Sequence, residues 1–537
     1  MRTHVSPALP ESGYMASLAK AKSDLRDLAP FLGRLFIALS FVAAAMAYAL
    51  VRAQNGGNPE FALWIATAAG FGAYMALNIG ANDVANNIGP VVGARVIPLA
   101  GALIMAAVFE FGGALIAGGQ VISTVRGGIV MPEALADRNV YVWVMMAALL
   151  AAALWLNLAT VFGAPVSTTH SIVGGVMGGG IAAAGLSAVD WSVMANIAAS
   201  WIISPLLGGL FAALFLYAIK RFVTYEPQVL KAAQRIVPLL VAAMTWSFGT
   251  YLILKGFKKV WSASLLEATM ASALIALVAW AVSRFLIARR LPKLQNDKSA
   301  VNQLLALPLI FSAALLSFAH GSNDVANAIG PLAGIYDVLT NDAMQEKAII
   351  PFWVMGLGAA GLAIGLLLFG PRVIQTVGGE LTRLDAMRAY CIAMAATITV
   401  ITASQLGLPV STTHVTVGAV LGVGFLREWL KRRYARIVSD IRTLHAGRDE
   451  AECDAFIARM QASPFAQRRA MIDALRREHA KRLADTGVCG SAAAAERGEA
   501  LVNRALMTKV LSAWIITVPL TALISAVIYF TLRGIML

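Results

Sequence analysis

The chain has 537 residues, of which 59% are hydrophobic and 13% are charged. Soluble domains carry about 25% charged and 45–50% apolar residues, so this composition excludes an ordinary cytosolic protein and predicts a polytopic membrane protein. The net charge is +14, but Lys and Arg collect between apolar segments, as the positive-inside rule expects, so we expect no nucleic-acid partner.

Residues 1–32 are polar, and we expect a cytoplasmic amino-terminal segment there. The apolar segments that follow have lengths that suit membrane helices better than buried strands. They lie near 33–52, 61–80, 97–119, 140–162, 166–185, 191–219, 235–254, 264–287, 303–320, 350–370, 389–406, 410–426 and 510–532. These segments predict an all-α polytopic membrane protein with about 12–13 membrane helices, including broken or half helices at the midplane.

The basic loops at 220–235 and 284–298 should be cytoplasmic. The loop at 181–190 holds no Lys or Arg, and the loop at 336–348 is mostly acidic, so both should be external. The amino terminus is then inside and the carboxyl terminus outside. The predicted order after 1–32 is an extra membrane helix (33–60), a first transport repeat (61–219), a linker with two membrane helices (220–302), a second transport repeat (303–426), a soluble cytoplasmic helical insert (427–509) and a final membrane helix that completes the second repeat (510–537).

The chain contains one pattern twice, in the same order. The matching pairs are IGANDVANNIGPVVG (79–93) with HGSNDVANAIGPLAG (320–334), GAPVSTTHSIVGGVMG (163–178) with GLPVSTTHVTVGAVLG (407–422), QVISTVRGG (120–128) with RVIQTVGGE (372–380), and SWIISPL (200–206) with AWIITVPL (513–520). The charge-derived topology runs the first copy inward and the second outward. Inverted repeats of this kind predict a secondary transporter with its site at the midplane.

PVSTTH stands at 165–170 and 409–414. Pro cannot continue a preceding helix but suits a first turn, and the following Ser or Thr can cap the new helix. Two such helix starts facing each other would offer N–H groups, positive dipole ends and hydroxyls to a tetrahedral oxyanion. The alternative is that the hydroxyls only cap kinked helices. Duplication favours binding by Ser167, Thr168, Thr169, Ser411, Thr412 and Thr413.

Asp83 and Asp324 lie inside apolar segments, where a carboxylate is costly and indicates a functional site. Asn86 and Asn327 share a helical face with them at i+3. Carboxylate and amide oxygens suit a hard cation such as Na+, and the glycines of both motifs (Gly80, Gly89, Gly321 and Gly330) would permit unwinding that frees carbonyls. A structural Asp–Asn hydrogen bond between helices is the alternative.

Glu110 lies within a long apolar segment, has no counterpart in the second half, and is a candidate cation ligand or a structural acid. His170 and His414 follow the Thr pairs and could support the site, carry protons or pack helices. His320 precedes GSND, and the equivalent position in the first half holds Ile79. His320 is a weaker candidate for the same roles.

An enzyme is not expected. Ser and His stand at i, i+3 in both PVSTTH copies, but no orienting acid and no nucleophile elbow accompany them. HExxH and Walker A motifs are missing from the sequence, and the three cysteines form no CxxC pair. We therefore predict no cofactor and no transition metal, and an ion gradient as the energy source.

GANDVAN, AHGSNDVANAIGPL, RVIQTVGGELT and the two PVSTTH segments resemble the signatures of the PiT-class inorganic phosphate transporters, over about 61–426 and the final helix. The resemblance implies that Asn82, Asp83, Asn323 and Asp324 line the substrate and cation region, that the six hydroxyl residues surround phosphate, and that the protein is a homodimer. The NDVAN form is more similar to sodium-coupled members than to proton-coupled bacterial ones. Some animal members carry a further membrane acid before each phosphate segment, which this sequence lacks.

These observations predict a symporter, in a bacterial-type inner membrane, that imports inorganic phosphate with a cation, most readily Na+. We assign Asn82 and Asn323 to phosphate with the six hydroxyl residues, and Asp83, Asn86, Asp324, Asn327 and Glu110 to the cation. The alternatives are an H+-coupled permease for phosphate, sulfate or a similar oxyanion, a passive anion channel, and a phosphate receptor that signals through the insert.

Overall fold

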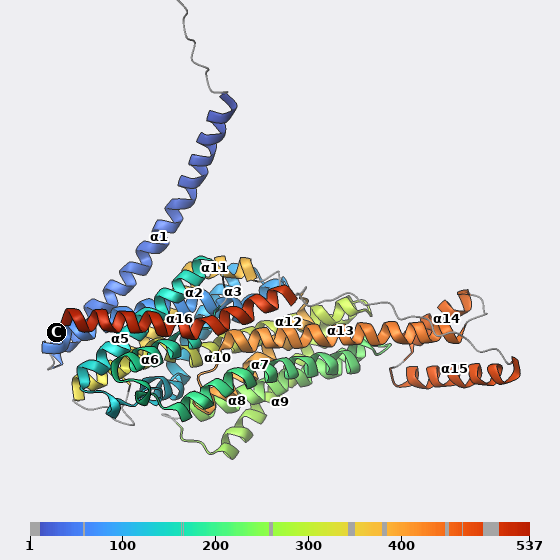
Figure 1. The fold of residues 1–537 in the computed structure, drawn as a ribbon. Helices are drawn as coiled ribbons and strands as arrows, with labels where there is room; N and C mark the ends of the chain where they lie inside the picture. Colours follow the sequence, from blue (N-terminus) through green and yellow to red (C-terminus); the bar gives the residue numbers. More distant parts are fainter. Residues whose placement is uncertain are drawn as a thin grey trace, which may run out of the picture.

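A computed structural model gives the arrangement of the chain. It describes residues 11–56, 59–162, 164, 166–256, 261–341, 350–377, 384–445, 450–463, 465–486 and 504–536. These ranges contain sixteen α-helices and no β-strand (Figure 1). The predicted all-α fold is confirmed. Four predicted features lie partly outside the described residues. They are the amino-terminal segment (at 1–10), the external loop (at 342–349), the weak repeat match (at 378–380) and the insert (at 446–449, 464 and 487–503).

Eleven stretches of the described chain are long and apolar enough to cross a membrane. Their principal helices are α1 (Glu11–Asn55), α2 (Ala62–Gly93), α3 (Leu99–Ala117), α5 (Arg138–Val161), α7 (Trp191–Ile219), α8 (Val229–Tyr251), α9 (Leu265–Arg290), α10 (Lys298–Asn341), α11 (Phe352–Val377), α12 (Ala386–Gln405) and α16 (Arg504–Met536). The two other predicted apolar segments form α6 (Thr168–Ala184) and α13 (Thr412–Leu444), which both begin at a PVSTTH motif.

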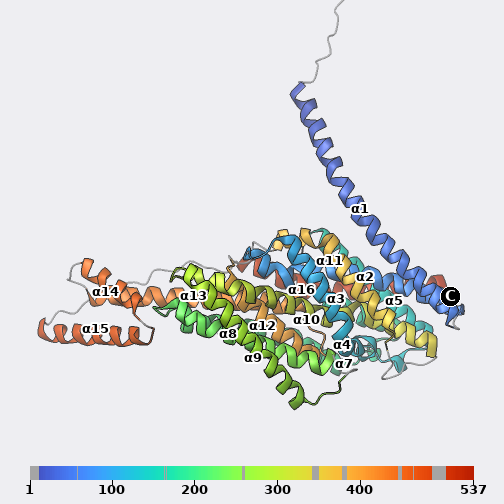
Figure 2. The ribbon, with the colours of Figure 1, turned by 180° about the vertical axis from the view of Figure 1, so that it is seen from behind.

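The two copies of the sequence pattern pack as related halves that exchange their last helices. In chain order, α2, α3, α5, α6 and α7 correspond to α10, α11, α12, α13 and α16. The packing is reciprocal, because α2 lies against α11 while α10 lies against α3. The last helix of each half crosses over: α7 packs on α12 and α13, and α16 packs on α5 and α6 (Figures 1 and 2).

The NDVAN segments stay helical, which corrects the expectation that their glycines unwind the chain. Both lie within continuous helices, α2 and α10. A Cβ added to Gly80 would lie 2.0 Å from the carbonyl oxygen of Leu362, and one on Gly321 would lie 2.1 Å from that of Glu110. Gly80 and Gly321 therefore allow close approach of helix backbones, a common use of small residues in membranes.

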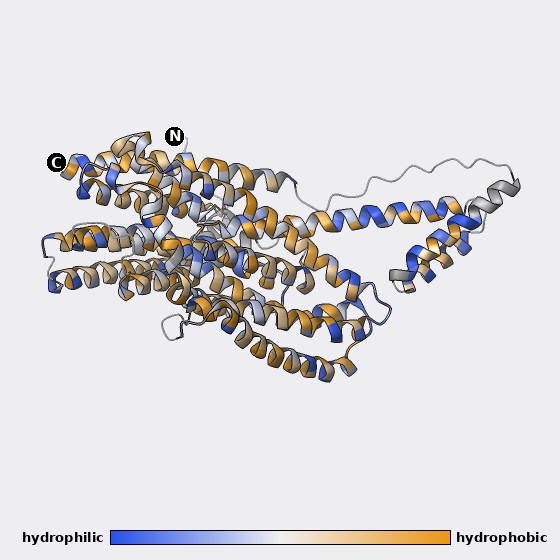
Figure 3. Cartoon of the chain, turned by 90° about the horizontal axis from the view of Figure 1, so that it is seen from below, coloured by the Kyte–Doolittle hydropathy of each residue, from blue (hydrophilic) through white to orange (hydrophobic). Residues whose placement is uncertain are grey.

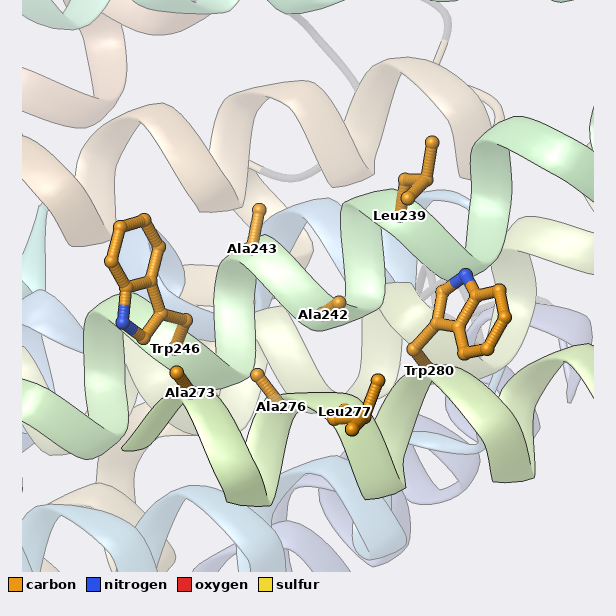
Figure 4. Close-up of a pocket in the computed structure, with 8 residues that line it drawn as sticks. All are labelled: Leu239, Ala242, Ala243, Trp246, Ala273, Ala276, Leu277 and Trp280. Atoms are coloured by element: carbon orange, nitrogen blue, oxygen red, sulfur yellow. The ribbon is translucent and has the colours of Figure 1, made fainter. Parts of the chain in front are cut away.

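The hairpin of α8 and α9 lies at the edge of the bundle. The two helices pack chiefly on each other, and many of their large apolar side chains are exposed, as a lipid-facing surface requires. Between them lies an open groove of about 470 Å³ with Trp246 and Trp280 at its two ends and alanines on its floor (Figure 4).

The insert forms a small helical unit of its own. The end of α13 packs with α14 (Glu450–Ala462) and α15 (Phe465–Thr486) around a core of Ile441, Cys453, Met460 and Leu475. This part is much more hydrophilic than the apolar bundle (Figure 3). It extends from one end of the bundle, and the carboxyl terminus lies at the other (Figure 1).

Candidate functional site

Two helix starts meet in the interior of the bundle. Ser167 is the N-cap of α6 and accepts a hydrogen bond from the backbone N–H of His170 at 3.1 Å. Ser411 caps α13 in the same way, with the N–H of His414 at 3.2 Å. The Thr169 hydroxyl donates to the carbonyl of Val410 at 3.1 Å, which ties one start to the other. The PVSTTH motifs thus form capped helix starts, as the sequence predicted.

Each NDVAN aspartate accepts a hydrogen bond from the first threonine of its own repeat. Thr168 Oγ1 donates to Asp83 Oδ2 at 2.9 Å, and Thr412 Oγ1 donates to Asp324 Oδ2 at 2.9 Å. All four side chains are buried. The equal geometry of residues that are far apart in the sequence shows that the two repeats build equivalent half-sites.

The second threonines join the half-sites. Asn86 Nδ2 donates to Thr413 Oγ1 at 2.8 Å, and Thr413 Oγ1 donates to Asp83 Oδ1 at 3.2 Å. On the other side, Asn327 Nδ2 donates to Thr169 Oγ1 at 3.2 Å. An amide from each repeat therefore contacts a hydroxyl of the opposite repeat.

Asn82 and Asn323 each contact a residue shortly before one of the two helix starts. Asn82 Nδ2 donates to the carbonyl of Ala164 at 3.3 Å, and Asn323 Nδ2 donates to that of Val410 at 2.8 Å. Asn82 also donates to Thr160, and Ser404 donates to Asn323. Each asparagine thus ties its NDVAN helix to the chain that leads into the PVSTTH helix of its own repeat.

Three residues without counterparts in the other repeat pair with one another. Glu110 Oε1 accepts from Asn87 Nδ2 at 2.6 Å and lies 3.1 Å from His320 Nδ1. Sequence reasoning missed Asn87. The signal was its lack of symmetry, because the second NDVAN motif has Ala328 at that place.

His320 connects the symmetric and asymmetric parts of the site. Its Nε2 lies 2.9 Å from Asp324 Oδ2 and 3.7 Å from Asp83 Oδ2, and the side chain is fully buried. One imidazole thus contacts all three acids of the site, which are Asp83, Asp324 and Glu110. One ligand atom each of Asp83, His320 and Asp324 lies within 4.8 Å of the other two.

Several oxygen atoms at this place have no hydrogen-bond donor within the described protein. They are buried and include Asn82 Oδ1, Asn87 Oδ1, Asn327 Oδ1 and Glu110 Oε2. Buried acceptors cost free energy unless a donor, a water molecule or a cation satisfies them. Carboxylate and amide oxygens in one cluster are suited to a hard cation such as Na+.

The rings of His170 and His414 do not join this cluster of acids. They lie 4.3 Å apart between centroids, and they pack on Trp201 at 3.8 Å and Trp514 at 3.6 Å, respectively. These four side chains line an apolar cavity of about 700 Å³ between α6, α7, α13 and α16. Their backbone N–H groups belong to the helix starts, whereas their imidazoles face this cavity.

Comparison with known proteins decides the family. Residues 79–525 match the profile of the phosphate transporter family. The chain belongs to the phosphate transporter family. A Helicobacter pylori protein of this kind, named "Putative phosphate permease", is 44% identical over 513 residues, which are 93% of this chain and 95% of the relative. A Chlamydia muridarum protein with the same name is 42% identical over 391 residues, which are 69% of this chain and 91% of the relative.

A solved structure has the same fold. It is titled "The sodium-dependent phosphate transporter", and it matches this chain with a TM-score of 0.71 and 30% sequence identity. The match covers 88% of this chain and 99% of that one. Both the predicted family and the expectation of a multi-pass transporter, rather than an enzyme, are confirmed.

Proposed function

We propose that this transporter is a secondary active symporter that imports inorganic phosphate together with Na+. One observation supports this proposal above others: the threonine hydroxyls of two facing helix starts donate to the two repeated aspartates. Groups that suit an oxyanion and groups that suit a cation are thereby in direct contact.

Phosphate has suitable donors at the helix starts. The first turns of α6 and α13 present backbone N–H groups and positive dipole ends, and Thr168, Thr169, Thr412 and Thr413 add hydroxyls. We propose that phosphate lies between these two turns, flanked by Asn82 and Asn323. Ser167 and Ser411 contribute chiefly as N-caps that hold the turns in place.

Cations are needed because three acids surround this position. Asp83, Asp324 and Glu110 are buried around the imidazole of His320. A phosphate anion beside them would be repelled unless cations entered as well. The unsatisfied oxygens of Asn82, Asn87, Asn327 and Glu110 would complete the cation ligands, together with Asn86 near Asp83.

The shared hydroxyls suggest how the two substrates are coupled. A hydroxyl hydrogen can point to a carboxylate or to a phosphate oxygen, but not to both. When Na+ binds Asp83 and Asp324, the carboxylates no longer need Thr168 and Thr412, and these hydroxyls become available to phosphate. Binding of the cation would thus promote binding of the anion, and the nearly neutral loaded site could then change its exposure across the membrane.

The proposed units for this movement are the predicted repeats, 61–219 and 303–426 with 510–537. The linker 220–302 and the extra helix 33–60 would lie outside the moving site, and 427–509 would form a cytoplasmic insert. We also propose a bacterial inner membrane and, from the family resemblance, a homodimer. Cross-linking in native membranes followed by mass determination tests the dimer.

Phosphate uptake into proteoliposomes tests the function. The purified full chain receives an inward Na+ gradient or an inward H+ gradient, imposed separately. Accumulation of radiolabelled phosphate with Na+ alone supports the proposal. Accumulation with H+ alone would instead favour proton coupling with His320 at the centre, and no accumulation with either would direct the test to sulfate.

A further inference from the structure

Four cations from four helices converge at the end of the bundle from which the insert extends. They are Lys220 after α7, Lys298 at the start of α10, Arg388 in the first turn of α12 and Arg427 in α13. Lys220 is close enough to the other three to be repelled by their charges, and Arg427 is repelled by Arg388. We call these four residues the basic cluster.

The helix ends that carry the basic cluster are held together by hydrogen bonds. The backbone N–H of Met387 in α12 donates to Asn302 Oδ1 in α10 at 3.1 Å. The Thr224 hydroxyl, four residues beyond Lys220, contacts Met387 Sδ at 3.7 Å. The convergence of charge is therefore a feature of the fold and not of independent surface side chains.

The charges around Lys220 are mostly positive. Asp385 caps α12 and lies 3.4 Å from Arg388 Nη2. Within the described part of the chain, the charges that act most on Lys220 are three cations and this one carboxylate. Lys220, Arg388 and Arg427 are also half-buried, so water screens their repulsion less than it would on an open surface.

The surrounding backbone also favours an anion. The amino-terminal ends of α10 and α12 both lie at the cluster, and each presents a positive dipole end. Arg388 and Arg427 can supply paired N–H donors, and Lys220 and Lys298 supply compact ammonium groups. Two guanidinium groups with two ammonium groups match the oxygens and the charge of a phosphate group.

We propose that the basic cluster binds a phosphate group at the insert end of the transporter, either as free inorganic phosphate or as the headgroup of an anionic phospholipid. This site is separate from the start of α13, because Arg427 lies 15 residues beyond Thr412 along that helix. It does not depend on what the central site carries. Free phosphate bound here would report its concentration on this side, and a bound headgroup would anchor α7, α10, α12 and α13 to the lipid surface.

Binding to the purified full chain tests this proposal with both sources. The lipid probes are dioctanoyl phosphatidylglycerol and neutral dioctanoyl phosphatidylcholine, with bound molecules counted by native mass spectrometry. The anion probe is radiolabelled inorganic phosphate, measured on the T168V/T412V background, which removes the two central hydroxyls that contact Asp83 and Asp324. Lys220→Gln with Arg388→Gln neutralises the cluster, and Arg433→Gln with Arg436→Gln removes equal charge from exposed positions on α13.

We expect the cluster variant to bind one of the two probes about 30-fold more weakly, because each Lys or Arg at an anionic surface contributes about a factor of five. The exposed pair should change binding by less than about threefold. Loss of phosphatidylglycerol binding identifies a headgroup, and loss of phosphate binding identifies the free anion. Unchanged binding of both probes, or an equal loss in the exposed control, overturns the proposal.

Two further variants separate charge from folding. Lys220→Arg with Arg388→Lys keeps both charges and should retain binding within about threefold. Lys298→Gln changes an exposed side chain and should weaken binding about fivefold, even if the double neutralisation prevents folding. Loss of binding in the charge-conserving variant while its thermal unfolding is unchanged would contradict the proposed site.

Discussion

Equivalent residues of the two repeats make equivalent contacts. The site residues that have no equivalent in the other repeat contact one another. Asp83 with Thr168 and Asp324 with Thr412 have the same 2.9 Å hydrogen bond. Glu110 has no equivalent acid in the second repeat. Gly321 packs on Glu110, whereas Gly80, the equivalent glycine of the first repeat, packs on Leu362. A symmetric pair of half-sites thus contains one asymmetric acid, whose neighbours are also asymmetric.

Replacing either repeated aspartate by asparagine should reduce cation-dependent phosphate uptake more than tenfold. Asp83→Asn and Asp324→Asn keep the shape but remove the charge that balances a bound cation. Initial uptake rates in proteoliposomes provide the measurement. Asp190→Asn is the matched control, because Asp190 is the N-cap of α7 and asparagine caps helices equally well. Full cation-dependent uptake in both aspartate variants would exclude the proposed mechanism.

Glu110→Gln should change the coupling rather than abolish binding of phosphate. The variant loses one acid beside His320, so one cation fewer should accompany each phosphate, and the net charge moved with each phosphate should become one unit less positive. The reversal potential of uptake measures this charge. Glu60→Gln, at an exposed position, should leave it unaltered, and an unaltered value in Glu110→Gln would remove Glu110 from the cation site.

At the scale of elements, Gly80 and Gly321 allow close contacts between helices, whereas the sequence had predicted that they unwind the chain. The long helices α2 and α10 remain continuous, while the actual breaks come before α6 and α13. Proline and an N-cap serine specify those breaks locally. Whether a glycine unwinds a helix or accommodates another one depends on the neighbouring helix, which local sequence does not contain.

Gly80→Ala and Gly321→Ala should each destabilise the protein, because the new methyl group would meet backbone atoms of α11 and α3. Overpacking of this kind costs about 1–3 kcal/mol. Gly89→Ala is the control, since nothing lies within 4 Å of its added Cβ, and alanine favours helix. The thermal midpoint of the purified protein should fall for the first two variants only; equal midpoints for all three would contradict the close approach.

At the scale of the whole molecule, a buried ion pair joins the two halves at the end opposite the insert. Arg126 Nη2 lies 3.2 Å from Asp337 Oδ2, and both side chains are buried. The Tyr141 hydroxyl donates to the carbonyl of Arg126 at 2.6 Å. The pair connects the short segment after α3 with the end of α10.

Arg126→Gln should cost about 3–5 kcal/mol of stability, because it leaves the Asp337 charge in a buried place without its cation. The double variant Arg126→Gln/Asp337→Asn removes both charges and should recover most of that loss. Chemical denaturation of the purified protein measures both. A double variant no more stable than the single one would show that the charges themselves do not interact.

The insert should be dispensable for transport itself. Its core of Ile441, Cys453, Met460 and Leu475 is separate from the two apolar clusters of the bundle. A hydrogen bond from Arg468 to the carbonyl of Tyr225 connects it to the bundle. Replacing 446–503 by a flexible linker should leave phosphate uptake within about twofold in proteoliposomes, whereas loss of uptake by a folded protein would assign the insert a direct role.

Local sequence by itself determined the helical membrane fold, the duplicated motifs and the two helix starts, because apolar length, proline and N-cap serines act within a few residues. The family also followed from the motifs. Only the tertiary structure decided that Asn87 joins Glu110 and His320, that Thr413 contacts Asp83, and that α7 and α16 exchange partners. These are contacts between distant segments, and they depend on how whole helices pack rather than on any local pattern.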